Sequence, residues 1–315
     1  MKPAPFAYVD PRGVEEALEA LSRYGEEGKV LAGGQSLVPL LNLRLAQPRV
    51  LIDLNRIPEL DYIRLQNRDG PMDGQARTPG VAIGAMTRQR SVEDAREVLS
   101  RLPLLREAVS WVGHPQIRNR GTVGGSIAHA DPAAELPLVF RALDGVATVR
   151  SQRGERTVPA ADFFVYTFTT ALEPDEMLSD IWLPLPAPRT GQASGRSGSA
   201  FVEVARRHGD FALVAVAASL TLDDHGVCVD ARIAIGGAAP VPARASGAED
   251  AVRGRRATLS LFREAGALAA REMEPMGDVH ADADYRREVA GVLTYRALTT
   301  AFERTPAGPV GEENA

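Results

Sequence analysis

Two glycine-rich stretches decide how this chain is organised: Ala32-Gly33-Gly34-Gln35-Ser36-Leu37 and Gly121-Thr122-Val123-Gly124-Gly125-Ser126-Ile127-Ala128. Each contains a pair of adjacent glycines, and the first opens directly into an amphipathic segment, residues 37–45. Glycine has no Cβ, so its backbone N–H can approach an anion closely, and a helix that begins there adds positive potential. Two such loops in one domain can hold the two phosphates of a dinucleotide.

Neither stretch is one of the common phosphate-binding motifs. A P-loop needs Gly-Lys-Ser/Thr after its glycines, and the chain has no such triplet. The Rossmann fingerprint Gly-x-Gly-x-x-Gly is also missing from both loops. Taken singly, a Gly-Gly pair equally suits a tight turn with positive φ, so the structural interpretation stays open beside the phosphate hypothesis.

Length, composition and charge narrow the class of protein. The chain has 315 residues, which suits two domains, and its 44% hydrophobic and 24% charged residues are typical of a globular protein. A net charge of −5 gives no electrostatic footprint for nucleic acid. The longest apolar run, residues 211–222, is too short to span a membrane, and residues 1–6 lack the apolar stretch of a secretory signal. These features predict a cytoplasmic protein.

Cysteine and histidine usage argues against a metal centre within this chain. Cys228 is the only cysteine, which excludes an internal disulfide and a cysteine-ligated iron–sulfur cluster or structural zinc site. It lies in the alternating segment Val227-Cys228-Val229, which favours a packed thiol over a nucleophile. The five histidines show no ligand spacing such as His-x-x-x-His.

The first part of the chain predicts a strand, loop, helix, strand unit. Asp10-Pro11 is typical of a helix cap followed by proline at the first helical position, and apolar residues then recur at helical spacing over residues 14–21. Residues 29–32 form a short strand, residues 37–45 a helix ended by Pro48, and residues 50–54 a buried strand. The first glycine loop therefore lies at the start of a helix.

The middle of the chain alternates short strands with short helices. Ser91 is expected to cap one helix, and the Asp131-Pro132 pair to start another that runs towards Ala142. Further elements follow from local pattern and turn residues: a polar loop marked by Gly70, Gly74, Pro79 and Gly80; a strand at 81–84; a helix at 104–112; a hairpin formed by 146–150, the Gly154 turn and 157–158; and a strand at 181–184.

A composition change separates this part from the rest. Residues 184–199 are rich in proline, glycine and serine, which predicts a linker. Beyond it we expect three antiparallel strands at 201–205, 211–222 and 227–236, with a hairpin turn at 223–226. Helices are expected at 248–272 and 284–304, and a disordered tail at 305–315.

Several of these stretches together resemble one family, the FAD-binding medium subunit of the molybdenum hydroxylases, whose members include aerobic carbon monoxide dehydrogenase and xanthine dehydrogenase. The resemblance is carried, in the family's order along nearly the whole chain, by Ala32–Pro39, Gln116–Pro132, Ala205–Ala212, Ala231–Gly237, Tyr285-Arg286-Arg287 and Arg296-Ala297-Leu298. Each motif alone is unspecific, whereas their combination is specific.

The resemblance implies an α+β fold in two domains. Residues 1–183 would form an FAD-binding domain of the vanillyl-alcohol-oxidase type, with subdomains at about 1–57 and 58–183. Residues 200–304 would form a three-stranded antiparallel sheet with a helical bundle. FAD would lie between the two domains.

The resemblance also implies a function and partners. The chain would be the electron-transfer flavoprotein of a heterotrimer, assembled as a dimer of heterotrimers, with a small subunit that holds two [2Fe–2S] clusters and a large subunit that holds molybdopterin. Electrons would pass from the clusters through FAD to an external acceptor. Two other functions stay open: a self-contained FAD-dependent oxidoreductase acting on a small molecule, and a non-enzymatic nucleotide-binding module.

The resemblance assigns cofactor contacts to named positions. The pyrophosphate would be held by backbone amides and by the hydroxyls of Ser36 and Thr122; the positions concerned are Ala32, Gly33, Gly34, Gln35, Ser36, Leu37, Thr122, Val123, Gly124, Gly125 and Ser126. Glu135 would bind the ribose hydroxyls, Ile181 and Phe201 would pack near the isoalloxazine, and Asp210 would lie near the reactive edge of the flavin. Asp131 would be a hydrogen-bond acceptor on the flavin side, and His129 lies in the second motif. No residue is assigned as catalytic, because the flavin carries the redox chemistry.

Each of these positions also has a purely structural interpretation. The two hydroxyls and Asp131 would serve as helix caps, and Glu135 as a solvated acid in a first helical turn. Ile181 and Phe201 would be strand core residues, and Asp210 would form a surface ion pair with the preceding arginines.

The sequence departs from the family at three points. Ser126 stands where many relatives have Asn or Asp, which removes that side-chain contact from the inference. Phe201 replaces a tyrosine of the carbon-monoxide-dehydrogenase type, so the ring is kept without the phenol. The single cysteine argues against the hydroxybenzoyl-CoA reductase branch, whose medium subunit carries an additional cluster.

Overall fold

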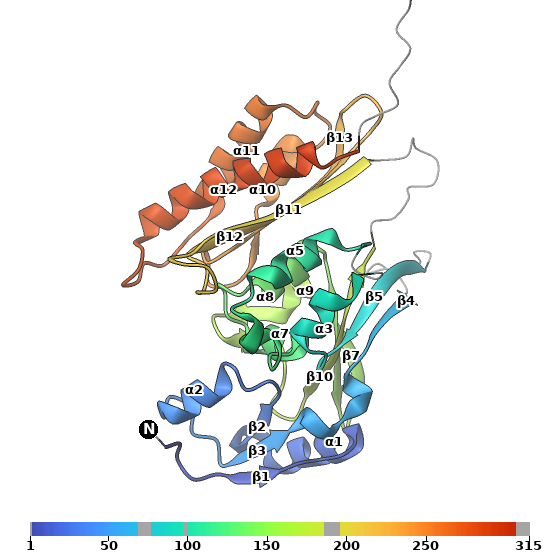
Figure 1. Ribbon diagram of the computed structural model, residues 1–315, viewed down its shortest axis with the longest axis vertical. Helices are drawn as coiled ribbons and strands as arrows, with labels where there is room; N and C mark the ends of the chain where they lie inside the picture. Colours follow the sequence, from blue (N-terminus) through green and yellow to red (C-terminus); the bar gives the residue numbers. More distant parts are fainter. Residues whose placement is uncertain (1, 69–76, 97–99, 186–195, 307–315) are drawn as a thin grey trace, which may run out of the picture. The chain divides into compact units, whose positions relative to one another are not determined.

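The computed structural model describes residues 2–68, 77–96, 100–185 and 196–306. The chain has an α+β fold and divides into two compact units, whose elements are labelled in Figure 1. Unit 1 consists of residues 1–102, 109–131 and 144–185, and unit 2 of residues 103–108, 132–143 and 186–315.

Unit 1 begins with a small parallel sheet. Its strands are β1 (Ala7–Val9), β3 (Val50–Asp53) and β2 (Gly28–Leu31), in that spatial order. The expected helix is α1 (Val14–Tyr24), whose apolar face is buried, but it begins three residues after the Asp10-Pro11 pair, with Gly13 at its N-cap. The predicted capping role of Asp10 is therefore wrong, and Asp10 instead forms an ion pair with Arg56 at 2.9 Å.

Unit 1 also contains a five-stranded antiparallel sheet. The spatial order is β4 (Ile63–Arg68), β5 (Thr78–Gly84), β10 (Met177–Pro184), β6 (Val146–Ser151) and β7 (Gly154–Pro159). The predicted hairpin is confirmed by the β6–β7 pairing. Pro79 and Gly80 lie within β5, so the polar loop predicted there is wrong at these two positions, while its Gly70–Gly74 part falls outside the described residues.

The remaining elements of unit 1 are short helices and a two-stranded ribbon. Ser91 lies inside α3, which begins at Gln89 with Arg88 at its N-cap, so the predicted Ser91 cap is wrong. The helix expected at 104–112 is confirmed as α5, whose first six residues belong to unit 2. The bounds are α2 (Leu37–Asn42), α3 (Gln89–Asp94), α5 (Pro103–Trp111), α6 (Pro115–Arg118), α7 (Val123–His129), α9 (Ala160–Phe163), β8 (Phe164–Tyr166) and β9 (Thr169–Thr170), with 3₁₀ turns at Gly25–Glu27, Leu54–Arg56 and Pro58–Leu60.

Unit 2 contains an antiparallel sheet in the order β11 (Arg196–Val204), β12 (Val214–Leu222), β13 (Cys228–Gly236) and β14 (Ala243–Arg244). The three predicted strands and the turn before β13 are confirmed, with Gly226 in the left-handed region at φ +76°. The predicted sheet of three strands is corrected to four by β14, which pairs two residues with β13. Cys228 is fully buried, and burial raises the pKa of its thiol to about 12, as expected for a packed residue.

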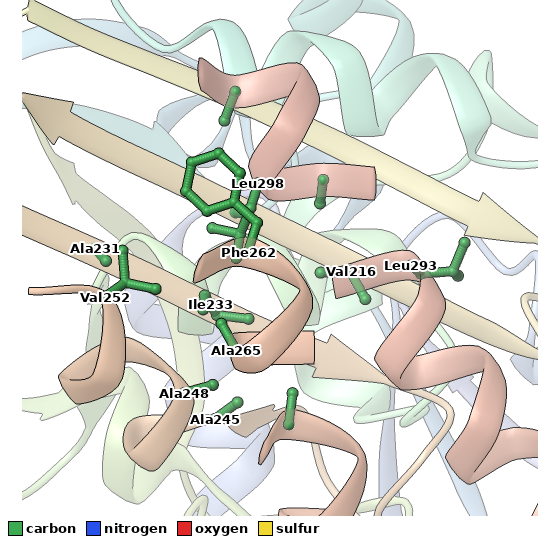
Figure 2. Packing of buried hydrophobic residues seen from close by; sticks show 14 of the residues in the cluster. Val216, Ala231, Ile233, Ala245, Ala248, Val252, Phe262, Ala265, Leu293 and Leu298 are labelled. Atoms are coloured by element: carbon green, nitrogen blue, oxygen red, sulfur yellow. The ribbon is translucent and has the colours of Figure 1, made fainter. Parts of the chain in front are cut away.

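Three helices cover one face of this sheet: α10 (Ser246–Val252), α11 (Leu259–Glu272) and α12 (Ala283–Glu303). The single helix predicted at 248–272 is thus two helices, because the chain turns at Arg253 and Gly254, and Gly254 has φ +74°. Figure 2 shows the core between helices and sheet, where Phe262 and Leu298 meet aliphatic residues of the strands such as Val216 and Ile233.

A short helix, α8 (Glu135–Ala142), packs against β12 and β13 and belongs to unit 2. Its N-cap is Ala134, so the predicted start at Asp131-Pro132 is wrong. Alternate residues of β11 distinguish the two faces of the sheet. Ala200, Val202 and Val204 contact the helical core, which leaves Phe201 and Glu203 on the opposite face.

The predicted linker at 184–199 is shorter than expected at both ends. β10 continues to Pro184 and β11 begins at Arg196, while residues 186–195 lie outside the described part. Of the predicted tail at 305–315, residues 307–315 also lie outside it.

Candidate functional site

The first glycine loop, residues 32–36, joins β2 to α2. Gly34 has φ +76°, a conformation that residues with a Cβ rarely adopt. Within the described residues, the backbone amides of Gly33, Gly34, Gln35 and Ser36 donate to no protein acceptor. Ser36 makes no side-chain cap to α2, so its hydroxyl is not used for capping. Consecutive unpaired amides of this kind form a concave donor set suited to an anion.

The second glycine loop is built differently. The amides of Val123 and Gly124 donate to the carbonyls of Thr87 and Ala85, each at 2.9 Å. The amide of Gly125 donates to Thr122 Oγ1 at 3.1 Å, so Thr122 caps α7 as its structural interpretation predicted. The amide of Ser126 donates to the Thr122 carbonyl. These four amides are therefore engaged within the chain, and the second loop contributes shape and hydroxyl groups more than free N–H donors.

The structure brings the two loops into direct backbone contact. A Cβ built on Gly33 would lie 2.4 Å from the Arg120 carbonyl oxygen and 2.8 Å from Gly121 Cα. A Cβ on Gly125 would lie 3.4 Å from the Cβ of Ala32. Only glycine permits this approach at residue 33, because both neighbours there are backbone atoms. The two motifs that are about ninety residues apart in sequence thus form one site.

His129 and Asp131 follow the second loop in unit 1. The His129 ring packs on Phe168 with ring centroids 5.0 Å apart. Burial lowers the pKa of His129, so the imidazole is neutral at pH 7. Ala130 between them has φ +53° and accepts from the Phe168 amide at 3.0 Å. This segment is a packed turn, in which His129 has an evident structural role.

Ile181 lies in the central strand β10 and is 2% exposed. It pairs with Ile83 on one side and with Ala147 on the other. The structure therefore gives Ile181 the strand-core role that its sequence context allowed.

Unit 2 contains a pair of acidic residues that sequence reasoning only half identified. Glu135, predicted from the resemblance, is 6% exposed at the start of α8. Glu203 on β11 was missed, although its place two residues after Phe201 puts it on the same strand face. Among the described residues neither carboxylate oxygen of Glu203 has a hydrogen-bond partner, and both are buried. Burial, and then the nearby charge of Glu135, raise the pKa of Glu203 to about 8.

We expect Glu203→Gln to stabilise the chain progressively more as the pH rises from 5 to 8. The ordinary pKa of a glutamate, 4.5, applies to Glu203 in the unfolded chain, whereas its pKa in the folded chain is about 8. Between these two pH values the folded state therefore keeps a proton that the unfolded state has lost. Stability then falls with rising pH, by at most about 1.4 kcal/mol per pH unit and by less for a partly solvated group. Calorimetric unfolding at pH 5, 6.5 and 8 measures this, with the surface variant Glu264→Gln as control. A pH-independent difference between wild type and variant would contradict it.

Phe201 and Asp210 are the two positions in unit 2 that the resemblance places near the flavin ring. Phe201 is 2% exposed, and its amide donates to Glu107 Oε2 at 3.0 Å. Asp210 accepts from Arg207 at 3.0 Å and from Arg206 at 3.4 Å, and the hydrogen bond from Arg207 holds the pKa of Asp210 below its usual value. Asp210 thus forms the ion pair that its structural interpretation predicted.

The described residues contain neither a cluster of metal-ligating side chains nor a membrane-spanning helix. Among them, no three His, Cys, Asp or Glu side chains gather as a metal site. The helices in the same residues also include none with the length and apolarity needed to cross a membrane.

The α+β fold and the open amides of the first glycine loop are features that suit a nucleotide-binding protein, and comparison with known families identifies the class. A family model described as "FAD binding domain in molybdopterin dehydrogenase" matches residues 4–186. A second model, "CO dehydrogenase flavoprotein C-terminal domain", matches residues 199–301.

Curated relatives and solved structures agree with the family models. The chain is 40% identical over 304 residues to the 6-hydroxypseudooxynicotine dehydrogenase complex subunit alpha of Paenarthrobacter nicotinovorans, covering 96% of this chain and 97% of that protein. It is 37% identical to the carbon monoxide dehydrogenase medium chain of Hydrogenophaga pseudoflava, covering 96% and 99%. A solved structure of carbon monoxide dehydrogenase from the same organism superposes with a TM-score of 0.87 at 38% identity, covering 97% of this chain and all of that one.

The chain therefore belongs to the FAD-binding medium subunits of the molybdopterin hydroxylases, the family of carbon monoxide dehydrogenase and xanthine dehydrogenase. It is a flavoprotein subunit of a molybdenum-containing dehydrogenase and part of a multi-subunit complex.

Proposed function

We propose that this chain holds FAD by its pyrophosphate at the paired glycine loops and passes electrons from the [2Fe–2S] clusters of a partner subunit to an external acceptor. The observation that carries the proposal is the run of four amides, Gly33 to Ser36, with no protein acceptor among the described residues. The loop supplies N–H donors, and its backbone shape depends on glycine at positions 33 and 34. These features fit a phosphate-bearing cofactor.

The residues of each unit have distinct tasks in this proposal. In unit 1 the amides of residues 33–36 and the Ser36 hydroxyl bind the pyrophosphate, while Thr122 holds α7 in place. In unit 2 the buried carboxyl groups of Glu135 and Glu203 accept hydrogen bonds from cofactor hydroxyls, which would satisfy the oxygens of Glu203. Phe201 and Asp210 keep the flavin-side positions that the family resemblance gives them. Bound FAD supplies redox chemistry at its isoalloxazine ring, and the protein supplies binding and electrostatics.

We further propose a heterotrimer with a small iron–sulfur subunit and a large molybdopterin subunit, paired into a dimer of heterotrimers. The names of the relatives support this, since one is a subunit of a dehydrogenase complex and another a medium chain. One of the related solved structures is described as a Cu,Mo-containing carbon monoxide dehydrogenase.

An absorption spectrum of the complex from its native host, with metal analysis of the same fraction, tests the proposal. We expect flavin bands together with iron, molybdenum and two further polypeptides. Flavin in an active single chain would instead favour the self-contained oxidoreductase. A complete native complex without flavin would overturn the assignment.

A further inference from the structure

Two residues outside both glycine loops, Asn55 and Arg88, form a hydrogen-bonded bridge between them. Asn55, in the 3₁₀ turn after β3, donates from Nδ2 to the carbonyl of Ala32 at 2.8 Å. Its Oδ1 accepts from Arg88 Nη2 at 2.6 Å. Arg88 Nη1 in turn donates to the carbonyl of Arg120, which leads into the second loop. One arginine and one asparagine thus link the two loops through their backbone carbonyls.

The bridge is itself anchored at both ends. Asp53 Oδ1 accepts from the backbone N–H of Asn55 at 2.9 Å and from its side-chain Nδ2 at 2.5 Å. These two hydrogen bonds fix the orientation of the Asn55 side chain. The other carboxylate oxygen of Asp53 accepts from the Tyr8 hydroxyl. Next to Arg88, the Gln89 amide donates to the Gly121 carbonyl at 2.9 Å. The bridge therefore rests on the carboxyl end of β3, the central strand of the parallel sheet, at one end and on the start of α3 at the other.

Holding a carbonyl also sets the direction of the next amide. In a trans peptide the C=O of one residue and the N–H of the next point in opposite directions, and the described chain has no cis peptide bond. The Ala32 carbonyl is directed at Asn55, so the Gly33 N–H is directed away from it. The Arg120 carbonyl lies against Gly33, which fixes the spacing of the loops. Asn55 and Arg88 thereby aim the first donor of the cradle.

The charge of Arg88 adds to this arrangement. Its guanidinium is partly buried, and burial, followed by the nearby charge of Arg120, lowers its pKa, while an arginine side chain stays a cation at neutral pH. No carboxylate among the described residues forms an ion pair with Arg88, in contrast to surface arginines such as Arg23, which pairs with Glu19. A partly desolvated cation beside open amides favours an anion.

We propose that Arg88 and Asn55 are positioning residues that lock the two glycine-rich loops together before the cofactor binds, and so preorganise the pyrophosphate cradle. The inference rests on the proposed function for the identity of the ligand, whereas the bridge itself is a property of the chain without ligand. Preorganised sites bind more tightly because less ordering remains to be done on binding.

Hydrogen exchange of the full chain without FAD tests the bridge directly. Arg88→Met and Asn55→Ala are expected to speed amide exchange about tenfold or more at both loops, because each removes a link that the two loops share. The readout at the first loop is Val38 and Leu40, whose amides donate to the carbonyls of Gly34 and Ser36, and the readout at the second loop is the 119–123 segment. Arg23→Met removes one surface arginine and is the matched control, with no change expected in either segment. Unchanged exchange in Arg88→Met would overturn the proposal, as would faster exchange in one loop alone.

Two further measurements separate the bridge from charge and from misfolding. Arg88→Lys keeps the positive charge, but an ammonium group lacks the planar fork of a guanidinium that donates to Asn55 and to the Arg120 carbonyl at once. We therefore expect amide exchange in Arg88→Lys to be as fast as in Arg88→Met, and its FAD affinity to be about tenfold or more below that of the wild type. Wild-type exchange and affinity in Arg88→Lys would show that charge alone matters and would overturn the bridge. The double variant Arg88→Met/Asn55→Ala should show the same exchange rates and the same FAD affinity as either single variant, because both substitutions break one connection. Additive losses would contradict the bridge. Circular dichroism checks that each variant is folded.

FAD titration and hydrogen exchange together distinguish failure of the proposed function from failure of the bridge. FAD titration of the wild-type chain and of the wild-type complex tests the proposed function, because failure of both to bind FAD would overturn that function. Hydrogen exchange without FAD still decides whether Arg88 and Asn55 hold the loops together.

Discussion

Gly33→Ala is expected to lower the affinity for FAD by about tenfold to a hundredfold while leaving both units folded. The new Cβ would lie 2.4 Å from the Arg120 carbonyl oxygen and 2.8 Å from Gly121 Cα, so neither neighbour can move aside as a flexible side chain would. Relief requires the two loops to separate, and overpacking of this kind costs about 1–3 kcal/mol. Because the strain is concentrated at the cradle, the loss falls on ligand binding.

The measurement is FAD affinity by flavin fluorescence, together with the flavin content of the purified complex. Gly13→Ala is the control, since a Cβ there meets nothing nearer than 4.0 Å and the residue is an N-cap of α1. We expect that control to bind FAD like wild type and to lose less than about 1 kcal/mol of stability. A Gly33→Ala complex with wild-type flavin affinity would show that the loop contact plays no part in binding.

The strand pattern and its turns were predictable because they depend on neighbours in sequence. Alternating apolar residues gave the β12 and β13 strands, and Asp223 to Gly226 supplied a turn with glycine at the residue that has positive φ. The same reasoning located the hairpin of β6 and β7. Such patterns need no knowledge of distant residues.

Helix starts were less predictable, since a cap signal does not say whether tertiary contacts use it. Asp10 precedes a proline as a cap would, yet it pairs with Arg56 from a distant turn. Ser91 lies within α3 because the helix already starts at Gln89, whose amide is held by the Gly121 carbonyl. In both cases a contact from far along the chain decides the local structure.

The candidate site was predictable in its motifs and not in its supports. The two glycine loops are local signals, and the structure brings them together. Asn55, Arg88 and Glu203 carry no local signal of function, because their roles arise from a carbonyl or an acid that is far away in sequence. For Glu203, its place two residues after Phe201 on the same face of β11 is the one hint that the sequence offers.

The fourth strand of the unit 2 sheet depends on a buried carboxylate. β14 has only two residues and follows two prolines, so propensity gives it no support. Glu249 on α10 is 3% exposed, and its Oε1 accepts from the β13 amide of Ile233 at 2.8 Å and from Arg244 Nε at 2.5 Å. Its Oε2 accepts from Arg244 and Arg253, each at 2.9 Å. One carboxylate therefore joins α10, β13 and β14.

Glu249→Ala is accordingly expected to destabilise the chain by about 3–5 kcal/mol. The substitution removes the carboxylate that accepts from the guanidinium of Arg244, whose side chain is only 13% exposed, and from the backbone amide of Ile233 in β13. Glu264→Ala is the matched control, since Glu264 pairs with Arg255 where both side chains are about half exposed, and its loss should cost less than about 1 kcal/mol. Calorimetric unfolding of the full chain measures both variants. Hydrogen exchange at Ala243 and Arg244 should also increase in Glu249→Ala alone, because Glu249 is the carboxylate that connects β14 to α10 and β13. Equal unfolding temperatures for the two variants would contradict this role, and would mean that β14 is held by its two residues of pairing with β13.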